Sequence, residues 1–304
     1  MPMSLAVPPV DLSLKSVLVA TDFSAASRQP LDHALAVARH FGAKFYLAHV
    51  VSGLAYTLAG PDTLELACEA ANRDLLQLEH ELVENGALDG IDHESLVRKG
   101  VVWAELEAII SQKCIDLVVL GTHGRRGLGR IILGSVAEDV FRHASCLVLT
   151  IGPNSCTFDF GKTNPRFLFA TDFGEGSLRA LPHAISFANR LRAKLTFLHV
   201  IPVATVSERP SDDVLVKRDV ARQACLRRLE QLLIGEELAQ PPEYLVHLGV
   251  PSQRILQVAG EIKAGLIFMG LHPSTHIGPP QMRWATAYEV VCDASCPVLT
   301  FRTQ

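Results

Sequence analysis

A glycine-rich loop between residues 121 and 135 holds the side chains and amides of this chain that are best suited to bind a ligand. An apolar run ends at Gly121, Gly124 follows, and Gly134-Ser135 opens a helical pattern after nine further residues. Glycine has no Cβ, so main-chain amides there can approach an anion closely. The free amides and positive dipole at a helix start favour phosphate, and the serine hydroxyl adds a donor. The spacing predicts a phosphate-binding loop; the alternative is that the glycines only end a strand and start a helix.

Charged residues inside the same loop leave its chemistry open. Arg125, Arg126 and Arg130 make the segment basic, and they are either phosphate ligands or solvated surface side chains. No Lys-Ser/Thr pair of the P-loop kind follows the glycines, and no evident base stands ready to activate water. We therefore assign no catalytic residue.

The elements that position this loop are short apolar runs alternating with helical patterns. The runs are rich in Val, Ile, Leu or Phe, as strands buried on both faces are. In the first half of the chain we expect strands at residues 16–20, 44–50, 94–98, 116–120 and 146–151. A long helix is indicated by apolar residues at steps of three and four, namely Leu64, Ala67, Ala71, Leu75, Leu78 and Leu82. This alternation predicts right-handed crossovers and an α/β fold with a doubly wound, mostly parallel five-stranded sheet flanked by helices. In such a sheet ligands bind beyond the carboxyl ends of strands, where the glycine loop would lie.

The whole pattern repeats about 150 residues later, which indicates a duplication. Leu18-Val19-Ala20-Thr21-Asp22-Phe23 returns as Leu168-Phe169-Ala170-Thr171-Asp172-Phe173, and Ala144-Ser145-Cys146 returns as Ala294-Ser295-Cys296. In the second copy we expect strands at 167–170, 194–200, 243–248, 266–269 and 297–301, with a long helix at 212–233. The predicted domains are residues 1–151 and 165–304, joined by a linker at 152–164.

The composition excludes several classes of protein. Of 304 residues, 48% are hydrophobic and 20% are charged, which is typical of a globular chain. With a net charge of -4 and no basic face, nucleic-acid binding is not expected. No apolar run is long enough for a membrane span, and Met1 to Asp11 lacks the features of a signal peptide.

The cysteines fit a reducing compartment. Seven cysteines without paired spacing argue against a disulfide framework, so reduced core thiols in a cytoplasmic protein are expected. Cys292 and Cys296 stand four apart, but no second pair completes a zinc site.

The pattern G-x-x-G-x9-G-S, with an Ala-Thr-Asp-Phe-Ser ending to the first strand, resembles the ATP-binding branch of the universal stress protein family. The resemblance covers nearly the whole chain in two copies, and implies the fold that this family shares with adenine nucleotide alpha hydrolase-like proteins. It implies that Ala20, Thr21 and Asp22 face the nucleoside and that Val50 meets adenine through its backbone. It further implies that ribose and phosphates contact Gly121, His123, Gly124, Gly134, Ser135 and Val136. The family usually carries Mg or Mn on the phosphates, not in a protein cage.

For Asp22 and for the histidines near the strand ends and the loop, binding and structural roles are the alternatives. Asp22 could accept hydrogen bonds from the nucleoside or help position metal, or could cap the next helix. His123 lies inside the glycine loop, where we expect a binding role. His49 and its twin His199, at the ends of apolar strands, are expected to be satisfied core histidines.

The second copy departs from the pattern at the loop. Pro273 stands where Gly124 stood, which removes an amide donor. Trp284 stands opposite Gly134 and Ala285 opposite Ser135, so an indole would fill the phosphate space and the hydroxyl is lost. Asp172, Val200 and His272 persist and could keep a nucleoside half-pocket. We expect that the second domain does not bind ATP as the first does.

Three functions remain open on the sequence alone. The first is a nucleotide-sensing regulatory module of the stress response, in which bound ATP alters a surface read by a protein partner or by the other domain. The second is a slow ATPase or autophosphorylating enzyme that uses Asp22, His123 and an ion. The third is a structural or chaperone-like scaffold without nucleotide. The last strands of both copies are hydrophobic and could pair as an internal pseudo-dimer, and two chains could associate further.

Overall fold

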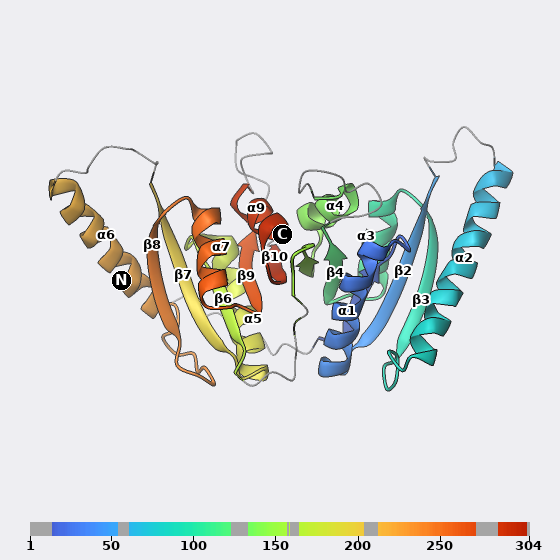
Figure 1. Cartoon of the computed structure of the whole chain (residues 1–304), viewed down its shortest axis with the longest axis horizontal. Coiled ribbons are helices and arrows are strands. Elements are labelled where there is room, and N and C mark those ends of the chain that lie inside the picture. Colours follow the sequence, from blue (N-terminus) through green and yellow to red (C-terminus); the bar gives the residue numbers. More distant parts are fainter. Residues whose placement is uncertain are drawn as a thin grey trace. The chain divides into compact units, whose positions relative to one another are not determined.

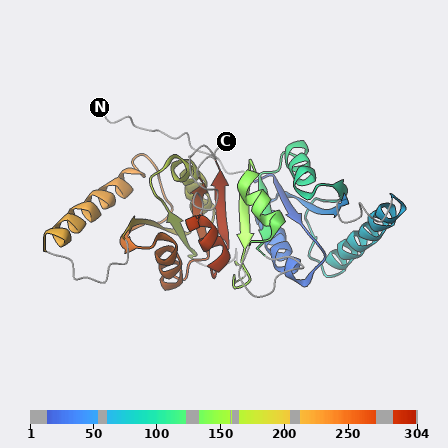
Figure 2. The ribbon, with the colours of Figure 1, turned by 90° about the horizontal axis from the view of Figure 1, so that it is seen from above.

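The computed structural model of the chain describes residues 14–53, 61–122, 133–156, 158, 164–203, 212–271 and 285–302. The chain divides into two compact units, an N-terminal one formed by residues 13–160 and a C-terminal one that contains residues 161–304. In each unit a layer of strands lies between helices (Figures 1 and 2). Among the described residues, no helix has the length and apolar character needed to cross a bilayer.

The N-terminal unit alternates strands and helices along the chain. Its elements are β1 (Ser16–Ala20), the short 3-10 helix η1 (Ala25–Ser27), α1 (Arg28–Phe41), β2 (Lys44–Ser52), α2 (Pro61–Glu84), β3 (His93–Gly100), α3 (Val102–Gln112), β4 (Leu117–Gly121), α4 (Ser135–His143) and β5 (Leu147–Ile151). The strand order is β3-β2-β1-β4-β5, and the neighbouring pairs are parallel. The order reverses between β1 and β4, and in a doubly wound sheet such a switch point opens a crevice at the carboxyl ends of the strands.

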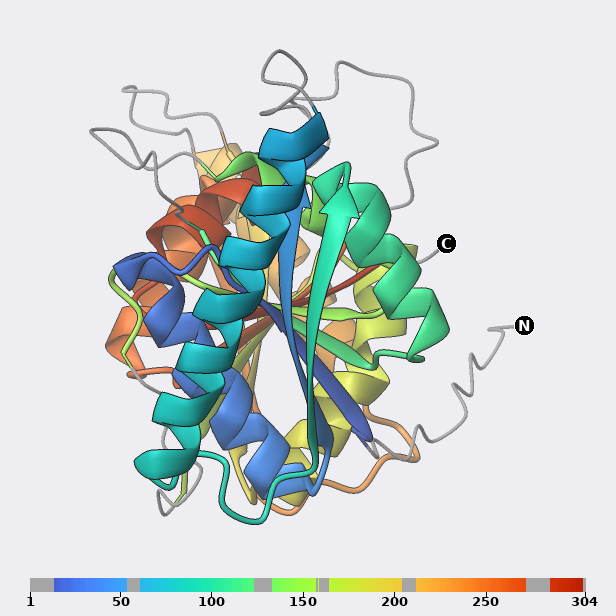
Figure 3. The same cartoon turned by 90° about the vertical axis from the view of Figure 1, so that its right-hand side faces the viewer.

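Burial explains these strands and helices. Val17, Leu18 and Val19 of β1 are completely buried, as expected for a central strand covered on both faces. The long helix α2 buries Ala71, Leu75, Leu78 and Leu82, which are members of the predicted apolar stripe. Figure 3 shows α2 running beside β2 and β3, the two strands that it contacts.

The C-terminal unit repeats this architecture. Its elements are β6 (Arg166–Ala170), α5 (Glu175–Arg190), β7 (Lys194–Pro202), α6 (Asp212–Gln231), β8 (Glu243–Gly249), α7 (Pro251–Glu261), β9 (Leu266–Leu271), α9 (Ala285–Asp293) and β10 (Val298–Arg302). The strand order is β10-β9-β6-β7-β8, again with parallel pairs. The duplicated, mostly parallel α/β fold predicted from the sequence is therefore confirmed.

Candidate functional site

Three strand ends meet at the carboxyl edge of the N-terminal sheet. In β1, Ala20 pairs in register with Ala48 of β2, and β1 pairs on its other side with β4, which ends at Gly121. The Thr21 amide donates to the Ala48 carbonyl at 2.9 Å, so the chain leaves β1 fixed against β2. The sheet therefore brings Ala20, Thr21 and Gly121 to one edge, beside the switch point.

Main-chain hydrogen bonds tie the start of α4 to the end of β4. The amide of Thr122 donates to the Ile151 carbonyl at 3.0 Å, and the amide of Gly134 donates to the Thr122 carbonyl at 2.9 Å. These bonds place Gly134 next to Gly121 although the two glycines are far apart in sequence. The predicted site residues His123 and Gly124 lie outside the described residues.

The first turn of α4 has the features of an anion site. Gly134 is the N-cap residue, with φ -60° and ψ 151°, and no side chain caps the helix. The first helical bond runs from the Glu138 amide to the Gly134 carbonyl at 2.8 Å, so the amides of Ser135 and Val136 precede the helical ladder. The amide of Gly134 donates to the Thr122 carbonyl and is not free for an anion. Gly134 therefore contributes to the site by directing the backbone into α4. Donors for an anion would come from the two residues that follow it.

Asp22 lies half-buried directly after β1. Its Oδ1 accepts a hydrogen bond from the Ser24 amide at 3.0 Å, which closes the turn between β1 and η1. The residue thus stabilises its own loop, and its carboxylate stands at the same edge as Gly121.

The β2 side of the edge carries Val50 and a partnered histidine. Val50 is half-buried and pairs in register with Arg98 of β3. The ring of His49 has Nδ1 2.8 Å from the Thr21 carbonyl, so Nδ1 carries the proton, and the ring stacks on Phe23 at 4.4 Å. His199 repeats both contacts with Thr171 and Phe173. Both histidines therefore have the expected partner for Nδ1, although each is half-buried and not part of the core.

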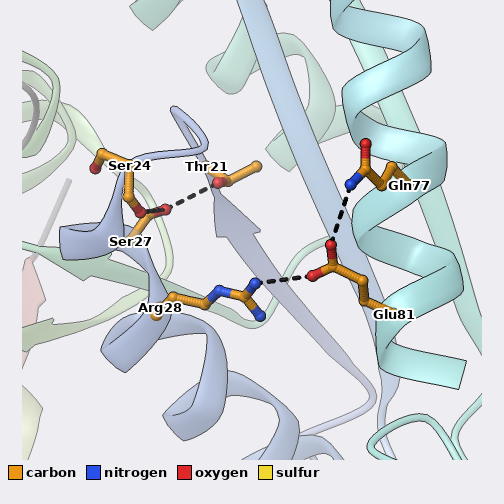
Figure 4. Close-up of polar contacts among 6 residues, drawn as sticks. All are labelled: Thr21, Ser24, Ser27, Arg28, Gln77 and Glu81. Atoms are coloured by element: carbon orange, nitrogen blue, oxygen red, sulfur yellow. Dashed lines mark hydrogen bonds and ion pairs between the residues drawn. The ribbon is translucent and has the colours of Figure 1, made fainter. Parts of the chain in front are cut away.

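Sequence reasoning did not select Ser24 and Ser27, which the structure places in the same turn. Within the described part of the chain, the buried hydroxyl of Ser24 has no hydrogen-bond partner. In Figure 4 this hydroxyl points away from the Thr21–Ser27 pair. A buried hydroxyl without a partner is costly, and a ligand is one way to satisfy it. Two features of the sequence could have indicated Ser24: it ends the Ala-Thr-Asp-Phe-Ser motif of the first strand, and the second copy has Gly174 at this position.

In the C-terminal unit, the first turn of α5 packs against the end of β9, at the position that corresponds to the end of β4. A Cβ on Gly270, at the position of Gly121, would lie 2.0 Å from the carbonyl oxygen of Gly176 in the first turn of α5. Helix α5 begins at Glu175, one turn earlier than α1 does in the first copy. Asp172 accepts hydrogen bonds from the Gly174 amide and the Ser177 hydroxyl, both at 2.8 Å. Backbone therefore packs against the end of β9, and Asp172 fixes the start of the helix.

The remaining features of the predicted second loop fall mostly outside the described residues. His272, Pro273 and Trp284 are not described, whereas Ala285 begins α9. Val200 is buried in β7. How these loop residues affect a ligand stays a prediction.

The cysteines form no metal-binding centre among the described residues. All seven are free thiols, and Cys292 and Cys296 are buried. Burial raises the pKa of the Cys146 thiol to about 12, so this thiol stays protonated at neutral pH. No group of three or more His, Cys, Asp or Glu side chains suited to a metal ion occurs in the described ranges.

Comparisons with known proteins agree with the duplication. The model of the universal stress protein family matches twice, at residues 13–152 and 163–302. A universal stress protein of Methanocaldococcus jannaschii is 31% identical over 138 residues, which cover 45% of this chain and 81% of that protein.

Solved structures show the same fold over the full length. A universal stress protein from Archaeoglobus fulgidus is 20% identical with a TM-score of 0.65, and the match covers 95% of this chain and 97% of that chain. A functionally unknown protein from Pseudomonas aeruginosa is 17% identical with a TM-score of 0.61, covering 95% and 93% of the two chains.

Proposed function

Because the chain belongs to the universal stress protein family, we propose that its N-terminal unit binds ATP and that the chain is a nucleotide-sensing regulatory module of the stress response. The observation that carries this proposal is the uncapped start of α4, held beside Gly121 by the bond from Gly134 to Thr122. A helix N-terminus next to a switch point favours phosphate through free amides and the helix dipole.

The other proposed contacts follow the same edge. Ala20, Thr21 and Asp22 would face the nucleoside from the end of β1, and Val50 would offer its backbone to adenine from β2. Ser135 and Val136, after Gly134, would bind the phosphate tail. Gly121, His123 and Gly124 would hold the ribose and phosphates. Ser24 adds a buried hydroxyl that needs a partner. A Mg or Mn ion would be bound by the phosphates.

Sensing follows from the way in which the ligand would join two elements. A triphosphate bound by the start of α4 and by the end of β4 stabilises one arrangement of that edge. A ligand shifts a conformational equilibrium only by its difference in affinity for the two states. The altered surface would be read by a protein partner or by the C-terminal unit. Seven free thiols fit a reducing cytoplasm as the place of action.

The C-terminal unit would not bind ATP in the same way. Its first helix already packs backbone against Gly270, and its Asp172 is engaged by the turn that starts α5. We therefore expect one nucleotide per chain.

Titration of the intact chain with a fluorescent ATP analogue tests the proposal, together with mass spectrometry of nucleotide released from gently purified protein. One equivalent of binding and released adenine nucleotide are expected. Two equal sites would contradict the difference between the units, and no binding together with no released nucleotide would favour a scaffold. Steady ATP turnover that is lost in Asp22→Ala, with binding retained, would assign an enzyme instead.

A further inference from the structure

A cavity lies in the N-terminal unit, on the face of the sheet covered by α1 and α2. It has a volume of about 210 Å³ and lies between the end of β1, the start of α1 and the middle of α2. Figure 4 shows the polar side chains around it, with Thr21 and Ser27 on one side and Gln77 and Glu81 of α2 on the other. Ligand sites for drug-sized molecules are larger, so this space suits a small molecule.

Three hydroxyls line the cavity, those of Thr21, Ser24 and Ser27. Ser24 Oγ has no partner among the described residues and can donate or accept, whereas Thr21 and Ser27 have no hydrogen left to offer. Ser27 Oγ donates to the Ser24 carbonyl at 2.7 Å, so the 3.0 Å contact between Thr21 Oγ1 and Ser27 Oγ must use the Thr21 proton. Thr21 Oγ1 also accepts from the Phe23 amide at 3.0 Å. What remains on both oxygens is acceptor capacity, which favours a ligand rich in N–H donors.

The charged side chains of the lining leave an excess of negative charge. Arg28 and Glu81 form an ion pair at 2.8 Å, and Gln77 donates to the same carboxylate at 3.3 Å. The hydrogen bond from Arg28 lowers the pKa of Glu81, so this carboxyl is ionised at neutral pH. Asp74 also lines the cavity and makes no hydrogen bond or ion pair with the described residues. One carboxylate therefore remains without a cation.

Phe23 provides an aromatic wall whose second face has no cation. His49 stacks on the ring with a centroid separation of 4.4 Å. Among the described residues no cation lies over Phe23, which lines the cavity. Aromatic faces attract guanidinium and ammonium groups.

The duplicated unit shows what occupies the equivalent place. Phe173, the twin of Phe23, stacks on His199 at 4.4 Å, and the guanidinium carbon of Arg228 lies over the same ring at 4.4 Å. The imidazole and the guanidinium therefore both contact the Phe173 ring. The C-terminal unit therefore places its own guanidinium on the aromatic ring.

The spacing of leucines identifies the residue of α2 that Arg228 replaces. The run Leu75, Leu78 and Leu82 of α2 recurs as Leu226 and Leu229 of α6 and Leu233 in the turn that follows α6. This alignment sets Arg228 opposite Gln77, which lines the cavity. In the same alignment Leu232 stands at the position of Glu81 and Leu178 at the position of Arg28, so the second copy lacks both partners of the ion pair. The acids and the space are found in the N-terminal unit, whereas the guanidinium is found in the C-terminal unit.

We propose that the cavity between α1 and α2 binds a small guanidinium compound, seated on Phe23 and facing Asp74 and Glu81, in the place that Arg228 takes in the other unit. The ring supplies the cation–π contact, the carboxylates supply charge, and Thr21 and Ser27 accept N–H donors. A guanidinium presents five N–H groups in a plane, which matches a lining of acceptors around an aromatic face. The cavity shares Thr21 and Ser24 with the edge proposed for the nucleoside, but its lining does not include the start of α4, and binding there does not require bound ATP.

The test uses the intact ¹⁵N-labelled chain and two matched variants. L-arginine and agmatine are titrated as guanidinium probes, and L-citrulline, a neutral compound of the same shape, is the control ligand. Gln77→Arg copies Arg228 and places a guanidinium in the cavity. Leu76→Arg copies Arg227 one residue away and adds the same charge outside the lining. Thermal unfolding of both variants checks that they fold.

The expected result is that agmatine or L-arginine shifts the amide resonances of Phe23, Ser27 and Gln77, and that L-citrulline does not. Gln77→Arg should weaken this binding by about tenfold or more, the loss of one cation–π and charge contact. Leu76→Arg should change it by less than about threefold. Equal shifts with L-citrulline, no shifts with any probe, or equal binding by the two variants would overturn the proposal. ATP binding should be the same in all three proteins, so failure here leaves the nucleotide proposal intact.

Discussion

Main-chain amides, more than side chains, form the proposed phosphate site. The amides of Ser135 and Val136 precede the first helical hydrogen bond of α4. The amide of Gly134 is already used, because it donates to the Thr122 carbonyl. Because almost every residue has a main-chain amide, the residue type does not show which amides are free to bind a ligand. Such amides are found in a sequence only through the glycine and serine spacing that permits them.

A proline at the first position of α4 tests these donors. Ser135→Pro removes one amide and one hydroxyl, and the backbone accepts it because Gly134 already has an extended ψ of 151°. Hydrogen bonds to a charged group contribute about 1.5–3 kcal/mol, so the ATP dissociation constant should rise about tenfold to a hundredfold. Isothermal titration calorimetry measures this change.

Val102→Pro is the matched control for that variant. Val102 is the first residue of α3 and follows Val101, whose ψ is 121°. The second copy already has Pro251 at the corresponding start of α7. This variant should bind ATP within about twofold of the parent protein, since it loses no phosphate contact. Equal losses in both variants would show that proline acts through the fold and not through the site.

Single residues could be predicted from the sequence where they stand at the end of a strand or are matched by the repeat. Asp22, Gly121 and Ser135 were predictable because they stand at the boundaries of apolar runs. Ser24 and Phe23 were not, because their importance comes from a buried hydroxyl without a partner and from a ring face beside a cavity. Both features depend on packing that brings α2 to the β1–α1 turn.

Among the helices and strands, the difference between α1 and α5 separates the two units. The chain after β1 forms the short helix η1 before α1, whereas α5 begins directly with Glu175. Gly176 then lies against Gly270, where only the absence of a side chain allows contact. The strands themselves were predictable to within two residues at most ends, since buried parallel strands are continuous apolar runs. The earlier start of α5 could not be predicted, because it depends on the contact between Gly176 and Gly270, which are far apart in the sequence.

Gly270→Ala tests the close contact between α5 and β9. The added Cβ would lie 2.0 Å from a backbone oxygen, so α5 must shift. Overpacking of this kind costs about 1–3 kcal/mol, which denaturant unfolding of the C-terminal unit should detect. Gly260→Ala in α7 is the control, because its Cβ meets nothing within 4 Å. It should raise stability by about 0.5–1 kcal/mol through helix propensity. An unchanged stability in Gly270→Ala would contradict the contact.

The histidines of α1 and α5 predict different responses to pH. His33 has Nδ1 2.8 Å from the Gln29 carbonyl, and its Nε2 accepts from the Phe158 amide at 3.3 Å. His183, its twin, has no partner for Nδ1 among the described residues, and burial lowers its pKa. His183 therefore stays neutral in the folded chain under conditions in which the unfolded chain binds a proton.

Protonation of the unfolded state gives the sign of the effect. Below the ordinary histidine pKa of about 6.5, the unfolded chain binds more protons at His183 than the folded chain, so stability falls as pH falls. His183→Leu should remove this contribution, and the variant should gain relative to the parent as pH is lowered from about 7.5 to about 5.5. Chemical denaturation at both pH values measures it. The His33→Leu variant should be less stable than the parent protein at both pH values, because the substitution breaks two hydrogen bonds. A difference between His183→Leu and the parent that does not change with pH would contradict the assignment.

For the molecule as a whole, duplication has produced two units of one fold that differ in their local contacts. The N-terminal unit keeps an uncapped α4 and a cavity beside Phe23, while the C-terminal unit places Gly176 against Gly270 and Arg228 on Phe173. The repeat made the architecture predictable from the sequence. The pairing of the last strands as a pseudo-dimer and the association of two chains stay predictions, for which sedimentation of the intact chain is the test.

The most direct test of the central claim is a crystal structure of the intact chain grown with millimolar Mg-ATP. The account predicts a triphosphate at the start of α4, with its oxygens within hydrogen-bond distance of the Ser135 and Val136 amides, and no nucleotide in the C-terminal unit. A triphosphate absent from that position, or equal nucleotide density in both units, would contradict it.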